Sequence, residues 1–188
     1  MRSSVAVVHD LISSLAPGDK LEIDHRSDTL RWLEATDDVF RRVKPATPRR
    51  HLVSYVVPTD PRDNSVLLVD HVNAGLWLPP GGHVEPDEHP TRTAYRETRE
   101  ELGIDVGSGS LDDQPAFLTV TRTVGTDHGH KDVSLWLPLS VHRGHALVLD
   151  ETEFREARWW SPTDIRAADP SRFDPHLTRF LTKIGRTT

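Results

Sequence analysis

The segment 81–104, GGHVEPDEHPTRTAYRETREELGI, constrains the fold more than any other part of the sequence. Its residues from Pro90 to Leu102 predict one helix, and Gly103 is placed to end it because glycine readily adopts the left-handed backbone just past a helix C-terminus. Apolar and small residues fall on one side of this helix, so we expect that side to pack on a sheet. These inward-facing residues are Ala94, Tyr95, Thr98 and Leu102.

The other side of the same helix is acidic. Glu97, Glu100 and Glu101 stand at positions i, i+3 and i+4, so their carboxylates share one face. Like charges at that spacing repel by roughly 0.2–0.5 kcal/mol per pair, but a hard divalent cation such as Mg²⁺ binds oxygen ligands and reverses the penalty. The preceding Gly81 and Gly82 let backbone carbonyls approach the same place. The alternative is a solvated acidic face without a ligand.

The rest of the chain alternates strands with short helices. The strand predictions, from apolar alternation and turn residues, are 51–57, 66–70, 76–78, 116–124 and 133–141, with 146–149 and 157–160 as two further candidates. Residues 162–167 and 175–184 predict closing helices, and residues 1–47 predict two or three short ones. We therefore divide the chain into a helical N-terminal extension, 1–47, and a mixed strand and helix domain, 48–188.

Composition narrows the class of partner. The net charge of −6 argues against a nucleic-acid polymer, because such binding draws on Lys and Arg to neutralise phosphates. No apolar run is long enough for a membrane span, and His9 and Asp10 interrupt the apolar start that a secretory signal would need. With no cysteine there is neither a disulfide framework nor a thiolate nucleophile. We expect a cytoplasmic protein that acts on small molecules.

The spacing of the acidic helix resembles the Nudix box, which is a glycine, five residues, a glutamate, seven residues and then Arg-Glu-apolar-any-Glu-Glu-any-Gly-apolar. Gly82 is followed by Glu88 after five residues, and seven more lead to RETREELGI at 96–104. The one departure is Thr98, where the family has an apolar residue; its methyl group can still pack. The resemblance covers roughly residues 50–165, with the box at 82–104 as its specific part.

The resemblance implies the fold and the reaction. Nudix hydrolases have an α/β/α sandwich with a mixed central β-sheet, which here would follow the helical extension. They cut the pyrophosphate linkage of nucleoside diphosphate derivatives and use Mg²⁺, with Mn²⁺ as a substitute. The substrate would be a small molecule such as a nucleoside triphosphate, ADP-ribose or a nucleotide sugar.

The family's roles transfer to matching positions of this box. Glu100 and Glu101 would be the principal metal ligands, and Glu97 a third ligand or the base for a metal-bound water. The Gly81 carbonyl would complete part of the coordination sphere, and Arg96 would hold Glu97 in place.

A further carboxylate ligand is expected before the later Trp-bearing strand, as in several family members. Glu153 has the better spacing and Glu151 is second, while a solvated acidic turn is the alternative. Glu88 is expected to anchor the loop before the helix and to belong to the substrate-binding residues.

Substrate selection is less well defined by the sequence. Candidate aromatic faces for a nucleobase are Trp77, Phe117, Trp136 and Trp159, although each of them suits core packing as well. In the polar loop 127–132, His130 and Lys131 are predicted to reach phosphate or ribose, and an exposed hairpin tip is the alternative. The His-x-His-x-Asp string that ends at Asp132 is also compatible with a transition-metal site.

Two other functions occur on the fold that the resemblance implies. Isopentenyl diphosphate isomerases resemble Nudix proteins but need a catalytic cysteine, which this chain lacks. A non-catalytic Nudix domain that senses a nucleotide or nucleotide sugar remains the alternative function, although all box glutamates are present. The N-terminal helices are expected to form a homodimer interface or to cover the substrate pocket, because helices this short need a packing partner.

Overall fold

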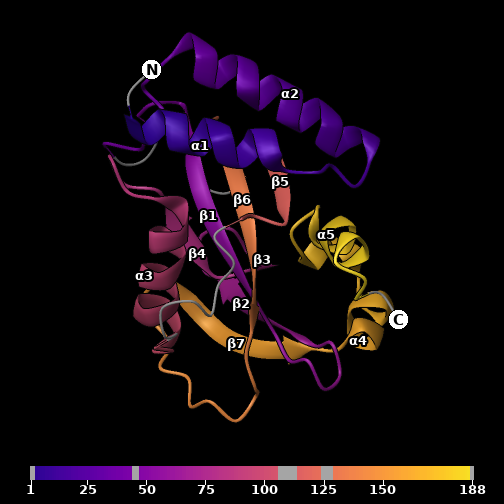
Figure 1. Cartoon of the computed structure of the whole chain (residues 1–188). Coiled ribbons are helices and arrows are strands. Elements are labelled where there is room, and N and C mark those ends of the chain that lie inside the picture. Colours follow the sequence, from indigo (N-terminus) through magenta and orange to yellow (C-terminus); the bar gives the residue numbers. More distant parts are fainter. Residues whose placement is uncertain (1–2, 44–46, 106–113, 124–128, 187–188) are drawn as a thin grey trace.

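A mixed β-sheet forms the centre of the computed structural model, which describes residues 3–43, 47–105, 114–123 and 129–186 (Figure 1). Within those residues, seven strands make up the sheet: β1 (Arg50–Thr59), β2 (Val66–His71), β3 (Leu76–Leu78), β4 (Gly81–His83), β5 (Phe117–Arg122), β6 (Lys131–Ser140) and β7 (Phe154–Trp160). The main order is β3-β2-β1-β6-β5, with β4 paired to β1 and β7 paired to β2.

The parallel pairing of β1 with β6 sets the register of the site. It runs from Arg50 opposite Lys131 to Thr59 opposite Ser140, whereas the other strand pairs are antiparallel. Successive side chains of a strand point to opposite faces of the sheet. Every second residue of β1 and β6 therefore points to one face of the sheet, and the residues between them point to the other face.

The described helices are α1 (Ser3–Ser14), α2 (Lys20–Ala35), α3 (Pro90–Leu102), α4 (Pro162–Ala167), the 3₁₀ turn η1 (Pro170–Arg172) and α5 (Leu177–Lys183). In Figure 1, α3 lies on one side of the sheet, and α4 and α5 lie on the other. The predicted α/β/α sandwich with its mixed sheet and N-terminal helices is confirmed. None of the helices that the described ranges form has the length and apolarity needed to cross a membrane.

The N-terminal helices pack on the sheet of their own chain. Val5, Val8 and Ile12 of α1 and Leu33 of α2 are buried in the same apolar cluster as Leu118 of β5. The residues before and after position 47 thus share a core. A homodimer through these helices stays a prediction, and it would have to use their outer surface, because the apolar stripe is already covered.

Hydrogen bonds of the Glu22 side chain in α2 stabilise this packing. Its buried carboxylate accepts hydrogen bonds from the backbone N–H of Leu118 at 3.1 Å and of Gly18 at 2.7 Å. It also accepts one from Lys183 Nζ of α5 at 2.7 Å. One side chain therefore joins the N-terminal helices to the edge of the sheet and to the last helix.

Two local expectations were incomplete. The candidate strand 146–149 is wrong, because the described backbone there pairs with the end of α3: the Val148 N–H donates to Leu102 O at 2.9 Å. Leu147 and Leu149 pack beside that helix end. Conversely, β4 is a strand that the apolar alternation does not predict, and it pairs with β1 at three positions.

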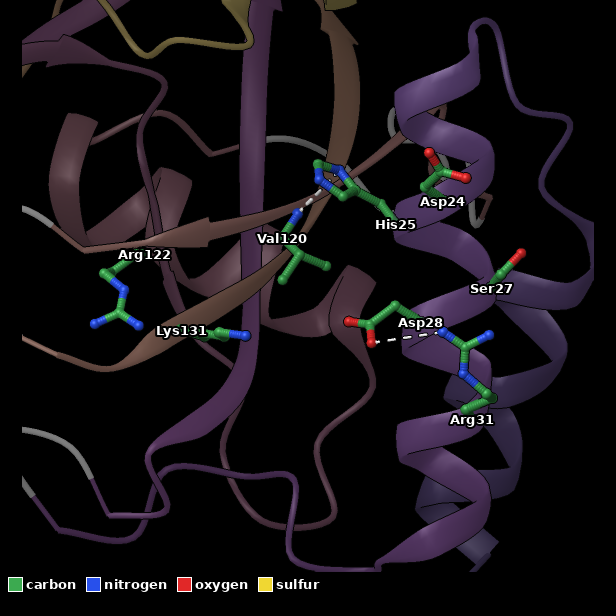
Figure 2. Close-up of a pocket in the computed structure, with 8 residues that line it drawn as sticks. All are labelled: Asp24, His25, Ser27, Asp28, Arg31, Val120, Arg122 and Lys131. Atoms are coloured by element: carbon green, nitrogen blue, oxygen red, sulfur yellow. Dashed lines mark hydrogen bonds and ion pairs between the residues drawn. The ribbon is translucent and has the colours of Figure 1, made fainter.

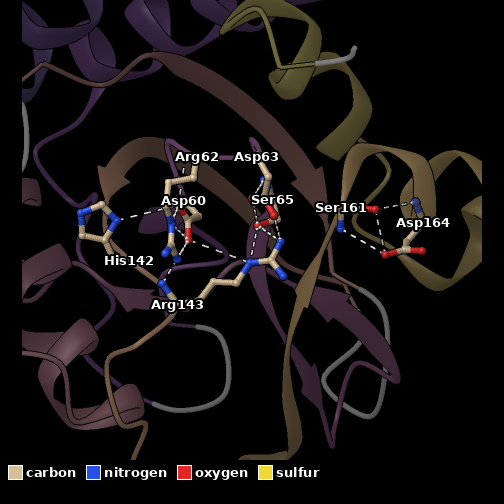
Figure 3. Close-up of polar contacts among 8 residues, drawn as sticks. All are labelled: Asp60, Arg62, Asp63, Ser65, His142, Arg143, Ser161 and Asp164. Carbon is tan, nitrogen blue, oxygen red and sulfur yellow. Dashed lines mark hydrogen bonds and ion pairs between the residues drawn. The ribbon is translucent and has the colours of Figure 1, made fainter.

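A polar network closes the other end of β1 (Figure 3). Asp60 is fully buried at the turn between β1 and β2, and it accepts bonds from Arg62 Nε at 3.0 Å and from the Arg143 backbone at 3.2 Å. Hydrogen bonds from Arg62, stronger than the opposing effect of burial, lower the pKa of Asp60. Arg143 also contacts Asp63 and Ser65, so this network ties the segment after β6 to the turn.

Candidate functional site

The helix α3 begins and ends as the sequence predicts. The His89 side chain accepts a hydrogen bond from Thr91 N at 3.2 Å, and Gly103 ends the helix at φ 66° with its N–H bonded to Arg99 O at 3.1 Å. Thr98, the one departure from the box, is fully buried and donates its hydroxyl to Ala94 O at 2.7 Å. This bond satisfies the hydroxyl, so threonine is tolerated on the inner face of the helix.

Three box glutamates line one cavity of about 700 Å³, which we call the carboxylate cavity. Glu101 is only 5% exposed, and its Oε2 accepts a hydrogen bond from Gly81 N at 2.8 Å. Burial, then the neighbouring charge of Glu97, raises the pKa of Glu101 to about 9. Burial also raises the pKa of Glu97, although the adjacent Arg96 opposes this. The third, Glu100, is more exposed, with 53% of its side chain accessible.

The two glycines of β4 allow this close packing. A Cβ on Gly82 would collide with the Glu97 carboxylate, and a Cβ on Gly81 would collide with the backbone of Ser54 in β1. Gly81 also has a φ of 148°, which L side chains rarely adopt. Glycine is therefore required at position 81 by the backbone of β1, whereas a side chain at position 82 would displace the Glu97 carboxylate.

Arg96 organises the carboxylates from the edge of the cavity. Its Nη1 donates to Glu97 Oε1 at 2.8 Å and to Glu100 Oε2 at 3.3 Å, and its Nε and Nη2 donate to the two oxygens of Glu88 at 3.2 and 3.0 Å. These bonds, above all the one with Glu88, raise the pKa of Arg96. Burial raises the pKa of Glu88, but its bonds with Arg96 and Thr93 outweigh that effect and lower it. Glu88 thus contacts Arg96, which in turn fixes Glu97.

Glu153, just before β7, lines the same cavity, whereas Glu151 is exposed and does not belong to the described lining. The charge of Glu153 contributes to the raised pKa values of both Glu97 and Glu101. Four carboxylates therefore converge around Arg96, in a cavity whose lining also includes Arg41, Arg42 and Arg122. This donor set, all oxygen and partly deprived of water, fits a hard divalent cation.

The predicted aromatic contacts lie in the core. Trp136 has no exposed surface, and the rings of Tyr55, Phe117 and Phe180 pack against it with centroids 5.1–5.7 Å away. Its indole N–H donates to Thr119 Oγ1 at 3.0 Å.

Trp77 is 6% exposed and packs edge-on against Trp160, with centroids 5.1 Å apart. Trp159 is only partly buried but also packs against the core. Trp77, Phe117, Trp136 and Trp159 are all absent from the described lining of the carboxylate cavity. Their contact with substrate stays a prediction that would require movement of these side chains.

His130 and Lys131 face opposite sides of the sheet. His130 is 4% exposed and lines the carboxylate cavity. Lys131 instead lines a second hollow of about 580 Å³ between α2 and strands β5 and β6, where Asp28 also lies (Figure 2). Arg122 lines both this hollow and the carboxylate cavity. Asp127 and His128 of the predicted loop lie outside the described residues. Neighbouring residues of one strand thus serve two different surfaces.

Several residues of the cavity were not found by sequence reasoning. Tyr55 and Phe154 bring aromatic rings to its wall, and Asp174 closes one side. Burial raises the pKa of Asp174 to about 6, while its Oδ1 accepts a hydrogen bond from His176 N at 2.7 Å. No motif marks these residues, because their position depends on the arrangement of β1, β7 and η1.

The family model described as the NUDIX domain matches residues 49–182. The asymmetrical bis(5'-nucleosyl)-tetraphosphatase of Mus musculus is 44% identical over 61 residues, which cover 30% of this chain and 37% of that protein. The CTP pyrophosphohydrolase of Escherichia coli (strain K12) is 40% identical over 62 residues, 31% of this chain and 46% of that protein. These matches span less than half the length of either relative.

The fold is similar to that of a MutT protein from Methanosarcina mazei Go1, with a TM-score of 0.58 and 22% identity over 72% of this chain and 92% of that one. At that identity the likeness supports the fold alone. The family model covers well over half of the sequence and includes the lining of the carboxylate cavity except Arg41, Arg42 and Val43. The chain therefore belongs to the Nudix family.

Proposed function

We propose that this protein is a Mg²⁺-dependent hydrolase, with Mn²⁺ as a substitute, that cleaves the pyrophosphate linkage of a nucleoside diphosphate derivative. The observation that carries the proposal is the convergence of Glu97, Glu100, Glu101 and Glu153 on one cavity. Ion pairing alone does not explain why these carboxylates converge, because ion pairs would lower their pKa values. Burial and mutual repulsion instead raise the pKa values of Glu97 and Glu101. Such perturbed carboxyl groups in a cleft are typical of a functional site.

Each residue has a distinct part in the proposed site. Glu100, Glu101 and Glu153 would hold the metal together with the Gly81 carbonyl oxygen. Bound there, Mg²⁺ would supply charge neutralisation of the pyrophosphate and a lower pKa for the attacking water. Arg96 keeps Glu97 in position through the 2.8 Å bond, and Glu97 acts as a further ligand or takes the proton from water.

Hydrolysis then exchanges one P–O bond for another. The water oxygen forms a bond to one phosphorus, and the bond from that phosphorus to the bridging oxygen breaks. The bridging oxygen leaves with the second phosphate, and the water proton passes to the carboxylate. Lining arginines offer positive charge to the phosphates of the substrate: Arg41, Arg42 and Arg122.

The size and chemistry of the cavity support a nucleotide derivative as the substrate. About 700 Å³ accommodates a nucleotide, and Tyr55 and Phe154 provide aromatic surface near the carboxylates. The names of the relatives point to dinucleoside polyphosphates and to CTP as substrates of those proteins. We propose nucleoside triphosphates, ADP-ribose, nucleotide sugars and dinucleoside polyphosphates as the compounds to test. A cytoplasmic location stays a prediction from the sequence.

The test is product release from this panel with Mg²⁺, with Mn²⁺ and with a chelator. We expect metal-dependent turnover that falls by at least about 100-fold in Glu100→Gln and Glu153→Gln, because even partners one step beyond a metal ligand contribute 10–100-fold. The matched control is Glu151→Gln, since Glu151 is an exposed acid on the same turn. Folded protein that binds these nucleotides without hydrolysing any of them would refute the enzyme and favour a sensor.

A further inference from the structure

A second group of metal-binding side chains, none of them a box glutamate, lies at the carboxylate cavity. His51, His83, His130 and Asp132 each offer one ligand atom, and these atoms all lie within 4.8 Å of one another. We call this group the histidine cluster. His83, His130 and Asp132 line the cavity, whereas the His51 side chain is fully buried behind them.

Strand register brings these residues together. His51 of β1 is directly opposite Asp132 of β6, and His83 of β4 is opposite Val53, two residues further along β1. His130 immediately precedes β6 and faces the same side as Asp132. The ring centroids of His83 and His130 lie 4.7 and 5.0 Å from that of His51. The cluster therefore joins three strands of the sheet.

The hydrogen bonds of His51 leave its second nitrogen directed at the cluster. Its Nδ1 lies 2.8 Å from Pro48 O, and a carbonyl only accepts, so Nδ1 carries the proton. The neutral ring then has a lone pair on Nε2. This atom lies 3.1 Å from Asp132 Oδ1, yet neither atom has a hydrogen-bond partner among the described residues. Two buried acceptors facing each other call for a positive ion between them.

His130 is oriented in a similar way. Its Nδ1 lies 3.1 Å from Thr123 Oγ1, while the hydroxyl of Thr123 donates to His130 O at 3.3 Å. If the Thr123 hydroxyl donates in that bond, Nδ1 donates to Oγ1, and Nε2 is then the nitrogen that offers its lone pair to a metal. Nε2 lies 3.5 Å from Asp132 Oδ1. Metal-binding histidines commonly donate their other ring N–H to an oxygen in this manner.

We propose that the histidine cluster is a second metal site, for a divalent transition ion and specifically for zinc. Three imidazole nitrogens and one carboxylate oxygen suit zinc, whereas Mg²⁺ prefers oxygen ligands only. In a tetrahedral zinc site the ligand atoms would be roughly 3.4 Å apart, from metal–ligand distances near 2.1 Å. The cluster reaches that geometry by contracting from its present maximum of 4.8 Å through small side-chain rotations.

Zinc at this position would hold the strand that carries the box glycines. The strand β4 has only three residues, of which Gly81 donates to Glu101 and Gly82 lies against Glu97. A bond from zinc to His83 would fix β4 to β1 and β6. The second ion thus acts through structure, and it does not depend on the hydrolase reaction proposed above.

The test is metal binding to the full chain after removal of all metals. With Mg²⁺ in excess, we expect one equivalent of Zn²⁺ by equilibrium dialysis and a higher melting temperature. Co²⁺ in its place should give the intense visible absorption of a tetrahedral site. Asp132→Asn and His130→Gln should each weaken Zn²⁺ binding by at least about tenfold, with folding checked by circular dichroism.

Two controls separate this site from the box. Glu101→Gln removes a carboxylate of the box and should leave the Zn²⁺ equivalent intact. His145→Gln removes an exposed histidine outside the cluster and should also have no effect. Absence of a bound equivalent in wild-type protein would overturn the proposal, and so would Zn²⁺ binding that survives both cluster substitutions or disappears with Glu101→Gln.

Discussion

Replacing Glu101 by glutamine is expected to stabilise the metal-free protein while it removes the proposed Mg²⁺ response. Glu101 is 5% exposed and lies near Glu97 and Glu153, so its charged form is disfavoured. Glutamine is neutral and nearly the same shape. Its amide oxygen can still accept the hydrogen bond from Gly81 N, which now spans 2.8 Å.

The magnitude follows from the change in pKa on folding. The pKa of Glu101 is about 9 in the folded chain, compared with an ordinary value of 4.5. At pH 7.5 the folded state must therefore take up a proton that the unfolded state has lost. With about 1.36 kcal/mol for each pH unit above 4.5, the penalty is at most about 4 kcal/mol. For a chain of this size that corresponds to roughly 8–16 °C in melting temperature.

The sign of the pH dependence is also defined. The folded pKa is raised, so the contribution of Glu101 to the free energy of unfolding is fully present below pH 4.5 and is lost as the pH rises toward about 9. Glu101→Gln should lose this part of the slope. Mg²⁺ must displace the same proton, so its apparent affinity for the wild type should increase by up to about tenfold per pH unit over this range.

The assay is thermal unfolding in chelator and in excess Mg²⁺, between pH 6 and 9. Glu100→Gln is the matched control, because Glu100 is half exposed on the same helix face and should change the metal-free melting temperature little. If Glu101→Gln melts below the wild type at pH 8 without metal, or keeps the wild-type pH slope, then burial of this carboxyl does not carry the penalty worked out above.

Three more substitutions test other parts of the structure. Gly82→Ala should abolish metal-dependent turnover in a protein that still folds by circular dichroism, because the added Cβ displaces the Glu97 carboxylate; full activity would contradict this packing. Glu22→Ala should lower the free energy of unfolding by about 1–3 kcal/mol in urea, since the Leu118 N–H loses its buried acceptor, and an unchanged midpoint would show that the contact contributes nothing. Thr98→Val should change the free energy of unfolding by no more than about 1 kcal/mol, because valine keeps the shape of the side chain and only the hydroxyl that bonds to Ala94 O is removed. A larger decrease would mean that this hydroxyl has a further role.

The box helix was the part of the site that the sequence predicted best. Its boundaries depend on local signals, namely Pro90 near the start and Gly103 at the end, and its two faces follow from helical periodicity. The same periodicity placed Glu97, Glu100 and Glu101 together, and the structure directs all three into one cavity. Roles within the cavity remain proposals, because they depend on a metal and a substrate.

The histidine cluster and the aromatic residues were beyond such local reasoning. His51 meets Asp132 only through the parallel register of β1 and β6, which no nearby turn specifies. Trp136 lies on β6. The alternation of side chains along this strand predicts that they point to two faces of the sheet, but it does not predict which face packs against helices. It proved to lie in the core beneath α5, with Phe180 against its ring.

The alternation along β6 has a consequence for how this protein can change. His130 and Lys131 are adjacent in sequence, but they belong to the carboxylate cavity and to the hollow beside α2, with the sheet between them. Substitutions at Lys131 should therefore alter the α2 side and leave His130 in the carboxylate cavity in place, whereas Arg122, which lines both surfaces, couples any change made at that position. Insertion of one residue just before β6 would do the opposite, since it would exchange the chemical character of both surfaces at once.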